Sequence, residues 1–184
     1  MSRSKHRWTE DDTLNVASKW GPIFGAPPAS IMSIVTIESD HNPSKVNMAR
    51  LEKGGAWGLG QQMLDEAGDK VSRIKHAYGK DYPEVKETAK KWKGSSNDLL
   101  DPDLNLMITS WQLGKLHQEF GSFPIVAAAY HQGAGAVRQR LAHGKPPVSP
   151  KQQPLGVSYV KQAMNAMYRY QTPFLIPAVY AVRG

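Results

Sequence analysis

Residues 30–39 read Ser-Ile-Met-Ser-Ile-Val-Thr-Ile-Glu-Ser, an apolar segment that ends in one acid, Glu38, and a serine. The side chains of Ile31, Ile34 and Val35 recur at helical spacing, so the segment is predicted to form a helix with one buried stripe. Glu38 falls next on that stripe, where a carboxylate is poorly solvated. Burial disfavours the charged form of a carboxylic acid and raises its pKa, as a proton donor that works near neutral pH requires.

Two glycine-containing segments follow the acid. Residues 55–61 read Gly-Ala-Trp-Gly-Leu-Gly-Gln, and residues 127–137 read Ala-Ala-Ala-Tyr-His-Gln-Gly-Ala-Gly-Ala-Val. Glycines let the backbone approach a ligand closely and adopt positive φ, and Tyr130 places an aromatic hydroxyl at the end of a predicted buried helix. Each feature alone has a plainer interpretation: a structural acid, a tight turn, and a core tyrosine whose hydroxyl reaches a carbonyl. Together they suggest a site that cleaves glycosidic bonds.

The chain has 184 residues and a net charge of +7, with no cysteine. That length predicts one domain over residues 1–184 with a substantial core, and the composition excludes a disulfide framework or a thiolate site. The charge indicates either a solvated basic surface or attraction to an acidic polymer, cell wall or nucleic acid. Four lysines cluster between Lys86 and Lys93, but Trp92 is the only aromatic residue among them and no nucleic-acid motif accompanies them. Nucleic acid is therefore the weaker partner.

The charged N-terminus is followed by no apolar stretch of signal or membrane-span length. If the substrate lies outside the cytoplasm, either something else delivers the protein or the sequence lacks its leader. The histidines show no ligand spacing such as His-Glu-x-x-His, and residues 54–60 lack the lysine and serine of a nucleotide-phosphate loop. No metal and no cofactor is therefore expected.

The hydrophobic pattern is mostly helical, which predicts a mainly α fold with at most a small β element. Residues 40–60 show no clean period and are predicted to form a long loop that could hold a short hairpin. Residues 144–156, rich in proline and glutamine, are expected to form a surface loop. The predicted helices cover residues about 11–20, 30–39, 62–78, 83–92, 101–120, 124–130, a short piece to 141, and a last helix through 157–167.

Several helix boundaries carry specific signals. Asp101 and Pro102 form a strong helix start, and Gly121 is a stop signal twenty residues later. Ser30 is predicted to cap the helix that carries the acid, and Gly21, Gly25, Pro27 and Pro28 to break the first helix.

These segments, in this order, resemble the lytic transglycosylase domain of the soluble type, in the lysozyme-like superfamily. The family pattern is a Glu-Ser pair after an apolar helix, then Gly-Ala-x-Gly-Leu-x-Gln, an Asn-containing helix start, Ala-Ala-Tyr-Asn-x-Gly, and a Tyr-Val pair on the closing helix. The resemblance spans about residues 30–170 and implies a catalytic core with a goose-type lysozyme or lytic transglycosylase fold. The matching segments are Glu38-Ser39, Gly55-Ala56-Trp57-Gly58-Leu59-Gly60-Gln61, Asp101-Pro102-Asp103-Leu104-Asn105, Ala128-Ala129-Tyr130-His131-Gln132-Gly133 and Tyr159-Val160.

The resemblance implies a role for each matching residue. Glu38 is expected to be the single catalytic acid and base. Tyr130 is expected to form a hydrogen bond near it, and Tyr159 to approach it from the last helix. The residues expected to contact the glycan, or to hold the helix end beside the acid, are Ser39, Asn47, Gln61, Met63, Tyr130, His131 and Tyr159.

Several positions depart from the family pattern. His131 stands where the family often has Asn, Gly60 where it often has Met, and Leu155 where a Glu is common. His131 could touch substrate or could be a satisfied polar residue. The stretch between the acid and the glycine-rich turn is longer than usual, and Asn47 is the candidate for a groove serine found there. These changes affect the expected substrate contacts more than the acid itself.

The reaction that the resemblance implies is cleavage of peptidoglycan between N-acetylmuramic acid and N-acetylglucosamine. Glu38 acts first as acid and then as base, which closes a 1,6-anhydro ring. A second carboxylate would favour a goose-type lysozyme, which uses water as the acceptor. Asp40 is expected to face away on a continuing helix, and Asp65 and Glu66 could be surface charges, so the transglycosylase is preferred.

Two further interpretations stay open. The protein could be a wall-binding or structural virion module that keeps the fold without turnover, or a basic nucleic-acid binder whose affinity falls steeply with salt. The small size and the absence of a leader look like a bacteriophage version, either an endolysin or a virion wall-piercing protein. Such a protein would be a monomer that acts on peptidoglycan glycan strands and could partner other virion proteins. It would reside in the virion or the host cytoplasm before delivery to the periplasm or cell wall.

Overall fold

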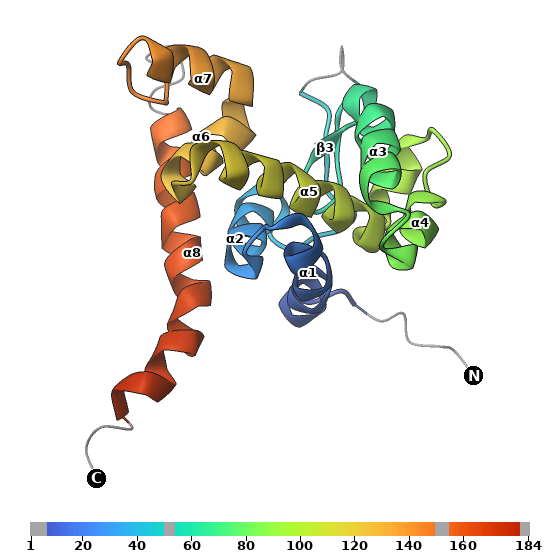
Figure 1. Ribbon diagram of the computed structural model, residues 1–184, viewed down its shortest axis with the longest axis horizontal. Helices are drawn as coiled ribbons and strands as arrows, with labels where there is room; N and C mark the ends of the chain where they lie inside the picture. The colour runs from blue at the N-terminus through green and yellow to red at the C-terminus, as the bar shows by residue number, and fades with distance from the viewer. Residues whose placement is uncertain (1–6, 50–53, 150–154, 181–184) are drawn as a thin grey trace. The chain divides into compact units, whose positions relative to one another are not determined.

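The computed structural model describes residues 7–49, 54–149 and 155–180, the side chains of 172–180 excepted (Figure 1). In that part of the chain the regular elements are α-helices, one short 3-10 helix and one small sheet, which confirms the mainly α prediction. Contacts divide the chain into two compact units, and the single domain stays a prediction. The first unit is Met1–Trp20 with Glu38–Thr109, and the second is Gly21–Ile37 with Ser110–Gly184. Residues of both units occur in α1 (Glu10–Phe24), α2 (Pro28–Ser39) and α5 (Pro102–Phe120).

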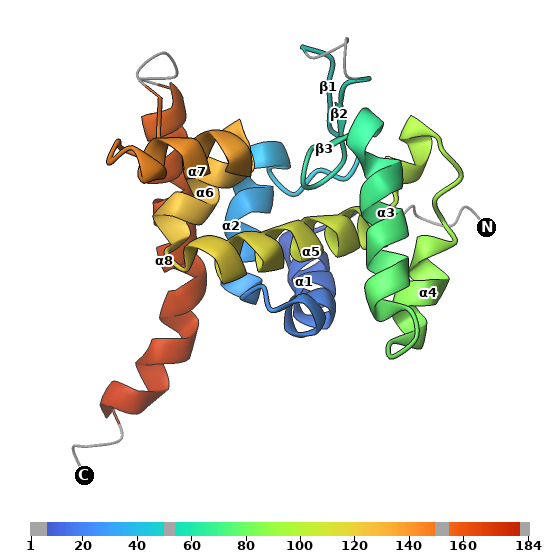
Figure 2. The same ribbon diagram turned by 45° about the horizontal axis from the view of Figure 1, so that its top comes forward.

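The sheet belongs to the first unit and confirms the hairpin predicted within residues 40–60. Its antiparallel strands run in the order β1-β2-β3, and Figure 2 shows them beside α3. Asn47 pairs with Ala56, which pairs with Met63, so these three residues share one face of the sheet. The strands are β1 (Val46–Asn47), β2 (Ala56–Trp57) and β3 (Gln62–Met63).

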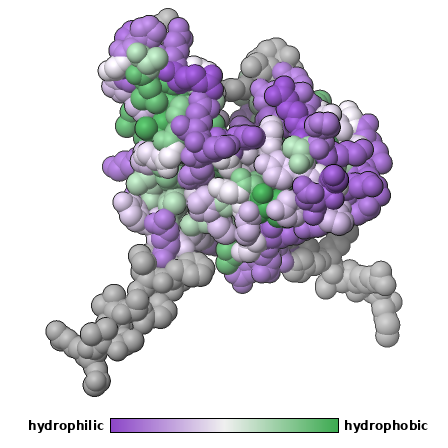
Figure 3. Space-filling view, viewed as in Figure 1, coloured by the Kyte–Doolittle hydropathy of each residue, from purple (hydrophilic) through white to green (hydrophobic). Residues whose placement is uncertain are grey.

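The next helices of the first unit follow the predicted pattern with shifted ends. The helix α3 (Leu64–Tyr78) buries Ala67, Val71 and Ile74, as its apolar period predicts, and packs against α4 (Pro83–Ala89). It begins two residues later than predicted, because the preceding two residues pair with β2. Hydrophilic residues cover much of the face of these two helices that Figure 3 shows. The short 3-10 helix η2 (Ser96–Leu100) leads into α5.

The start of α5 carries a network of charged and polar groups in the first unit. The carboxylate of Asp101 caps the helix by accepting a hydrogen bond of 2.9 Å from the backbone N–H of Leu104, as the sequence predicts. Asp103 accepts hydrogen bonds from the Trp20 indole N–H, at 2.9 Å, and from the Thr88 hydroxyl, at 3.0 Å. Two lysines complete the network, because Lys19 and Lys91 also pair with Asp103.

The second unit is built from helices that pack on α8. The helix α6 is buried over half of its residues and packs against both α7 and α8. The Ser33 hydroxyl donates a 2.6 Å hydrogen bond to the carbonyl of Ala163, and the Thr36 and Tyr170 hydroxyls lie 2.9 Å apart. These contacts join α2 to α8 within the unit. The helices named are α6 (Phe123–Gln132), α7 (Ala134–Ala142) and α8 (Leu155–Tyr180).

Two predicted boundaries in this unit are wrong. Ser30 does not cap α2, because the helix already begins at Pro28, a residue that suits the first helical position. Ser30 is instead fully buried, and its hydroxyl lies 3.0 Å from Nε2 of His117. Gly21 does not break α1, which continues to Phe24 and ends before Gly25, another of the predicted helix breakers, at φ 71°. A Cβ on Gly21 would lie 2.6 Å from the carbonyl oxygen of Ala26, so this glycine serves close backbone packing.

The helix stop predicted at Gly121 is confirmed. The helix α5 ends one residue before this glycine, whose φ of 67° lies in the left-handed region. Among the described residues, no helix is both long enough and apolar enough to span a bilayer.

Candidate active site

Glu38 lies on the last turn of α2, where it is half-buried beside the buried Ser39. The helix ends there because Asp40 and His41 both adopt positive φ, 52° and 57°. Residues other than glycine in this conformation cost about 1–2 kcal/mol each, and such strain is concentrated at functional sites. The helix ends at Ser39, as predicted, so Asp40 lies outside it and the expectation that Asp40 faces away on a continuing helix is wrong. The Asp40 side chain is exposed.

The glycine-rich turn lies between β2 and β3 and is packed too tightly for other residues. Gly58 has φ 73°, and a Cβ there would lie 2.3 Å from the carbonyl oxygen of Leu99. A Cβ on Gly60 would lie 2.0 Å from the Thr109 hydroxyl oxygen. The close approach of the turn to α5 accounts for glycine at a position where the resembling family often has methionine.

Gln61 ends the turn and has φ 48°, the third positive value at a described residue other than glycine. Its side-chain Nε2 donates to the carbonyls of Gly58, at 2.9 Å, and Lys45, at 3.2 Å. A flipped amide would place Oε1 next to these two carbonyl oxygens, which cannot donate to it, so the contacts fix the assignment of Oε1 and Nε2. The described part of the chain donates no hydrogen bond to Oε1 of Gln61, which leaves this oxygen as an acceptor.

Asn47 and Met63 lie on the same face of the small sheet, on either side of Ala56. The side chain of Asn47 is exposed and that of Met63 half-buried. Asn47 Oδ1 accepts a hydrogen bond of 3.0 Å from the backbone N–H of Ala49, which orients the amide. The structure thus places two of the predicted glycan-contacting residues on one face of the sheet, whose strands β2 and β3 flank the glycine-rich turn.

The remaining predicted residues lie in the second unit. His131 on α6 and Tyr159 on α8 stack, with ring centroids 4.3 Å apart and ring planes at 21°. Tyr130 precedes His131 on α6, and all three side chains are half-buried. The α6–α8 packing therefore joins His131 to Tyr159. The predicted residues fall into two groups, with Glu38 and its sequence neighbours of the sheet in the first unit and this aromatic group in the second.

The carboxylates considered as a second catalytic acid are all exposed. Asp65 and Glu66 occupy the first turn of α3, and Glu66 pairs with Lys70 at 2.9 Å. Asp40 is exposed after the end of α2. Within the described ranges, no cluster of three or more histidine or acidic side chains could hold a metal ion.

The structure also shows residues that sequence reasoning missed. The motif predicts no separate role for Asn105, yet this residue is fully buried and its side chain bonds the glycine-rich turn. Thr109, four residues later, is also fully buried and accepts a 3.0 Å hydrogen bond from the side-chain amide of Gln62. Two polar residues at i and i+4 on an otherwise apolar helix face were the available signal.

Comparisons with known proteins give one family and several solved structures. The family described as Transglycosylase SLT domain matches residues 15–146. No curated protein matches the chain in sequence.

Three of the matching solved structures are lytic transglycosylases. The 70-kDa soluble lytic transglycosylase from Escherichia coli has a TM-score of 0.67 and 24% identity, with 88% of this chain and 24% of that chain covered. An inactive glutamate-to-glutamine variant of the lytic transglycosylase Slt from Pseudomonas aeruginosa has a TM-score of 0.62 and 21% identity, over 87% of this chain and 24% of that chain. A complex of the 70-kDa soluble lytic transglycosylase with bulgecin A has a TM-score of 0.61 and 25% identity, over 89% and 25%. The chain thus spans about a quarter of these proteins, and the matches confirm the predicted lysozyme-like fold.

Proposed function

The chain belongs to the transglycosylase SLT domain family, and from this premise we propose that it cleaves the β-1,4 bond between N-acetylmuramic acid and N-acetylglucosamine in peptidoglycan. The observation that carries the proposal is the position of Glu38. It is a half-buried acid on the last turn of α2, inside the matched region, at a helix end held in a strained conformation.

In the proposed reaction one carboxyl group acts twice. Protonated Glu38 donates its proton to the glycosidic oxygen as the bond from that oxygen to the anomeric carbon breaks. Positive charge develops at the anomeric carbon of the muramic acid, and the acetamido oxygen of the substrate can stabilise it. The Glu38 carboxylate then removes the proton from the C6 hydroxyl, whose oxygen bonds to the anomeric carbon and closes the 1,6-anhydro ring. General acid catalysis of this kind contributes roughly 10²–10⁴-fold to the rate.

The exposure of the other carboxylates supports a transglycosylase over a hydrolase. An inverting glycosidase needs a second carboxylate to activate water, and a retaining one generally needs a second carboxylate as nucleophile. Asp40, Asp65 and Glu66 are exposed, and the Glu66–Lys70 ion pair occupies one of them. The internal C6 hydroxyl requires no such activation by a second group, since Glu38 itself accepts the proton.

The solved relatives support the assignment of the acid. The lytic transglycosylase from Pseudomonas aeruginosa was solved as a glutamate-to-glutamine variant that is inactive. The same substitution tests this chain: Glu38→Gln keeps the shape of the side chain and removes the titratable proton. We expect the rate of glycan release from purified peptidoglycan to fall at least about 100-fold, with the melting temperature nearly unchanged.

The matched control is Glu84→Gln, an exposed glutamate on α4 that should leave the rate unchanged. Retention of activity in Glu38→Gln would show that another group is the acid. Loss of activity in both variants would point to a general effect of charge. A wild-type protein that binds the wall and releases nothing would favour the non-catalytic binding module.

The biological setting of the protein is a separate matter. Its bacteriophage origin, its monomeric state, its virion partners and its route to the wall stay predictions from the sequence.

A further inference from the structure

A single buried amide holds both sides of the glycine-rich turn. Asn105, on α5 in the first unit, is fully buried, and all its hydrogen-bonding groups are in use. Its Oδ1 accepts from the backbone N–H of Gly60 at 2.8 Å. Its Nδ2 donates to the carbonyls of Trp57 and Leu99, each at 2.8 Å. The side chain therefore ties the residue before Gly58 and the residue before Gln61 to the same point on α5.

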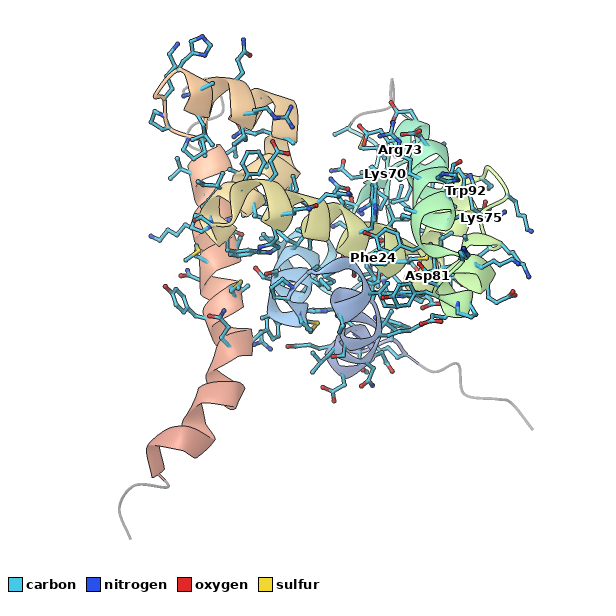
Figure 4. All side chains as sticks on the ribbon, in the orientation of Figure 1. Phe24, Lys70, Arg73, Lys75, Asp81 and Trp92 are labelled. Carbon is cyan, nitrogen blue, oxygen red and sulfur yellow. The ribbon has the colours of Figure 1, made fainter. Side chains whose placement is uncertain are left out.

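A second buried group holds the chain immediately after Gln61. The Gln62 side-chain amide donates to the Thr109 hydroxyl at 3.0 Å, and its oxygen accepts from Lys70, labelled in Figure 4, at 3.1 Å. The Thr109 hydroxyl in turn donates to the carbonyl of Asn105 at 2.9 Å. Polar groups on one face of α5 thus hold both sequence neighbours of Gln61.

The backbone conformation and the side-chain direction of Gln61 both depend on these contacts. Its backbone adopts φ 48°, a conformation that an unsupported glutamine would rarely occupy. One of the two carbonyls that orient its amide belongs to Gly58, inside the turn that Asn105 holds. Releasing the turn would move that carbonyl, relax the backbone strain and free the amide to rotate.

We propose that Asn105 is a positioning residue of the glycan site, which acts by fixing the direction of the Gln61 carboxamide. The oxygen of that carboxamide then faces a hydrogen-bond donor of the glycan, either a hydroxyl or an acetamido N–H. Thr109 supports the same geometry from the other side. This inference rests on the proposed function and adds to it a residue that does not touch the substrate.

The experiment is a double-mutant cycle with soluble, peptide-free glycan strands as the substrate. Gln61→Ala is expected to raise KM about 3- to 10-fold, the loss of one hydrogen bond to the glycan, with kcat little changed. Asn105→Ala should raise KM by a similar factor in the wild-type background. It should have no further effect on KM in the Gln61→Ala background, since it acts through Gln61.

A second variant covers the case in which Asn105→Ala does not fold. Thr109→Val keeps the volume of the side chain and removes the hydroxyl that holds Gln62. It is expected to raise KM by a smaller factor, and again only when Gln61 is present. The matched control is Thr88→Val, which removes another buried hydroxyl of the first unit, at the Asp103 network. It should lower the melting temperature and leave KM unchanged.

The outcomes separate this inference from the function on which it rests. Wild-type protein that does not turn over glycan strands would overturn both. Wild-type turnover with an unchanged KM in the folded Asn105 or Thr109 variant would overturn the positioning role alone. So would an equal rise in KM in the presence and absence of the Gln61 side chain.

Discussion

Replacing Asp103 by alanine should be one of the most damaging single changes in the first unit. The side chain is only 24% exposed and accepts hydrogen bonds from Trp20, Thr88 and Lys19, with Lys91 at 3.2 Å. Trp20 is fully buried and Thr88 nearly so, which means that water cannot replace the lost carboxylate at either group.

The magnitude follows from what each partner loses. A buried indole N–H without an acceptor costs about 2 kcal/mol, and the lost bond to the Thr88 hydroxyl about 1 kcal/mol. The lysines are 40% and 41% exposed, so solvent screens their pairs, which add about 0.5 kcal/mol together. The sum is about 3.5 kcal/mol, which for a chain of this length lowers the melting temperature by about 7–14 °C.

The assay is thermal unfolding of wild type, Asp103→Ala and a control, followed by circular dichroism at pH 7. The control is Asp69→Ala, which removes an exposed carboxylate paired with Arg73 and should lower the melting temperature by no more than about 1–2 °C. A loss of melting temperature in Asp103→Ala no larger than the loss in the control would show that the buried Trp20 and Thr88 do not depend on this carboxylate.

The pH dependence gives the same prediction a second test. Burial alone would raise the pKa of Asp103, but the hydrogen bonds and charges of Lys19, Thr88 and Lys91 outweigh it and hold the pKa below its usual value of 3.8. The folded state therefore binds the proton less readily than the unfolded state. The stabilisation is fully present well above pH 3.8 and is lost as the pH falls through the folded-state pKa. The stability difference between wild type and Asp103→Asn should shrink below pH 3.8, and a constant difference would contradict the account.

Three further predictions concern other contacts. Burial lowers the pKa of His117 below its usual 6.5, although a hydrogen bond with the backbone of Gly121 opposes the shift. The stability that neutral His117 contributes is therefore present above pH 6.5 and should be lost as the pH falls below it. The melting temperature of His117→Gln should lack that part of the decline between pH 7 and 5. Ser33→Ala removes the 2.6 Å bond to the carbonyl of Ala163 and should cost about 1 kcal/mol by urea unfolding, and a cost near zero would show that this bond does not hold α2 to α8. Gly60→Ala should lower the free energy of unfolding by about 1–3 kcal/mol, by the same method, because its Cβ would clash with the Thr109 hydroxyl. Adding Thr109→Ala to this variant should recover part of the lost stability, and no recovery would show that the clash lies elsewhere.

Local signals predicted the parts of the fold that depend on neighbouring residues. Asp101 caps α5 and Gly121 ends it because a side-chain acceptor and a positive φ act within one turn of the chain. Ser30 failed as a cap because a stronger local signal, Pro28, already starts the helix. Gly21 does not break α1, because glycine is required there for a different reason: the carbonyl of Ala26 packs against this position in the folded chain and leaves no room for a Cβ.

The candidate site likewise has features that the sequence predicts and features that only the folded chain shows. Glu38 and Gln61 could be proposed as site residues from the sequence, because each belongs to a short continuous motif, the Glu-Ser pair and the glycine-rich segment that ends in Gln61. The support of Gln61 could not be predicted, because the bond that holds the preceding residue, Gly60, comes from Asn105, which lies 44 residues beyond Gln61 along the chain. The positive φ of Gln61 and of the residues after Glu38 is likewise a property of tertiary support, which no local propensity predicts.

Digestion of purified peptidoglycan by the wild-type protein, with the masses of the soluble products determined by mass spectrometry, distinguishes the two possible reactions. The proposed reaction predicts muropeptides that end in 1,6-anhydromuramic acid, and Glu38→Gln should release none of them. Products heavier by one water, with reducing ends, would contradict the transglycosylase and identify a lysozyme on the same fold.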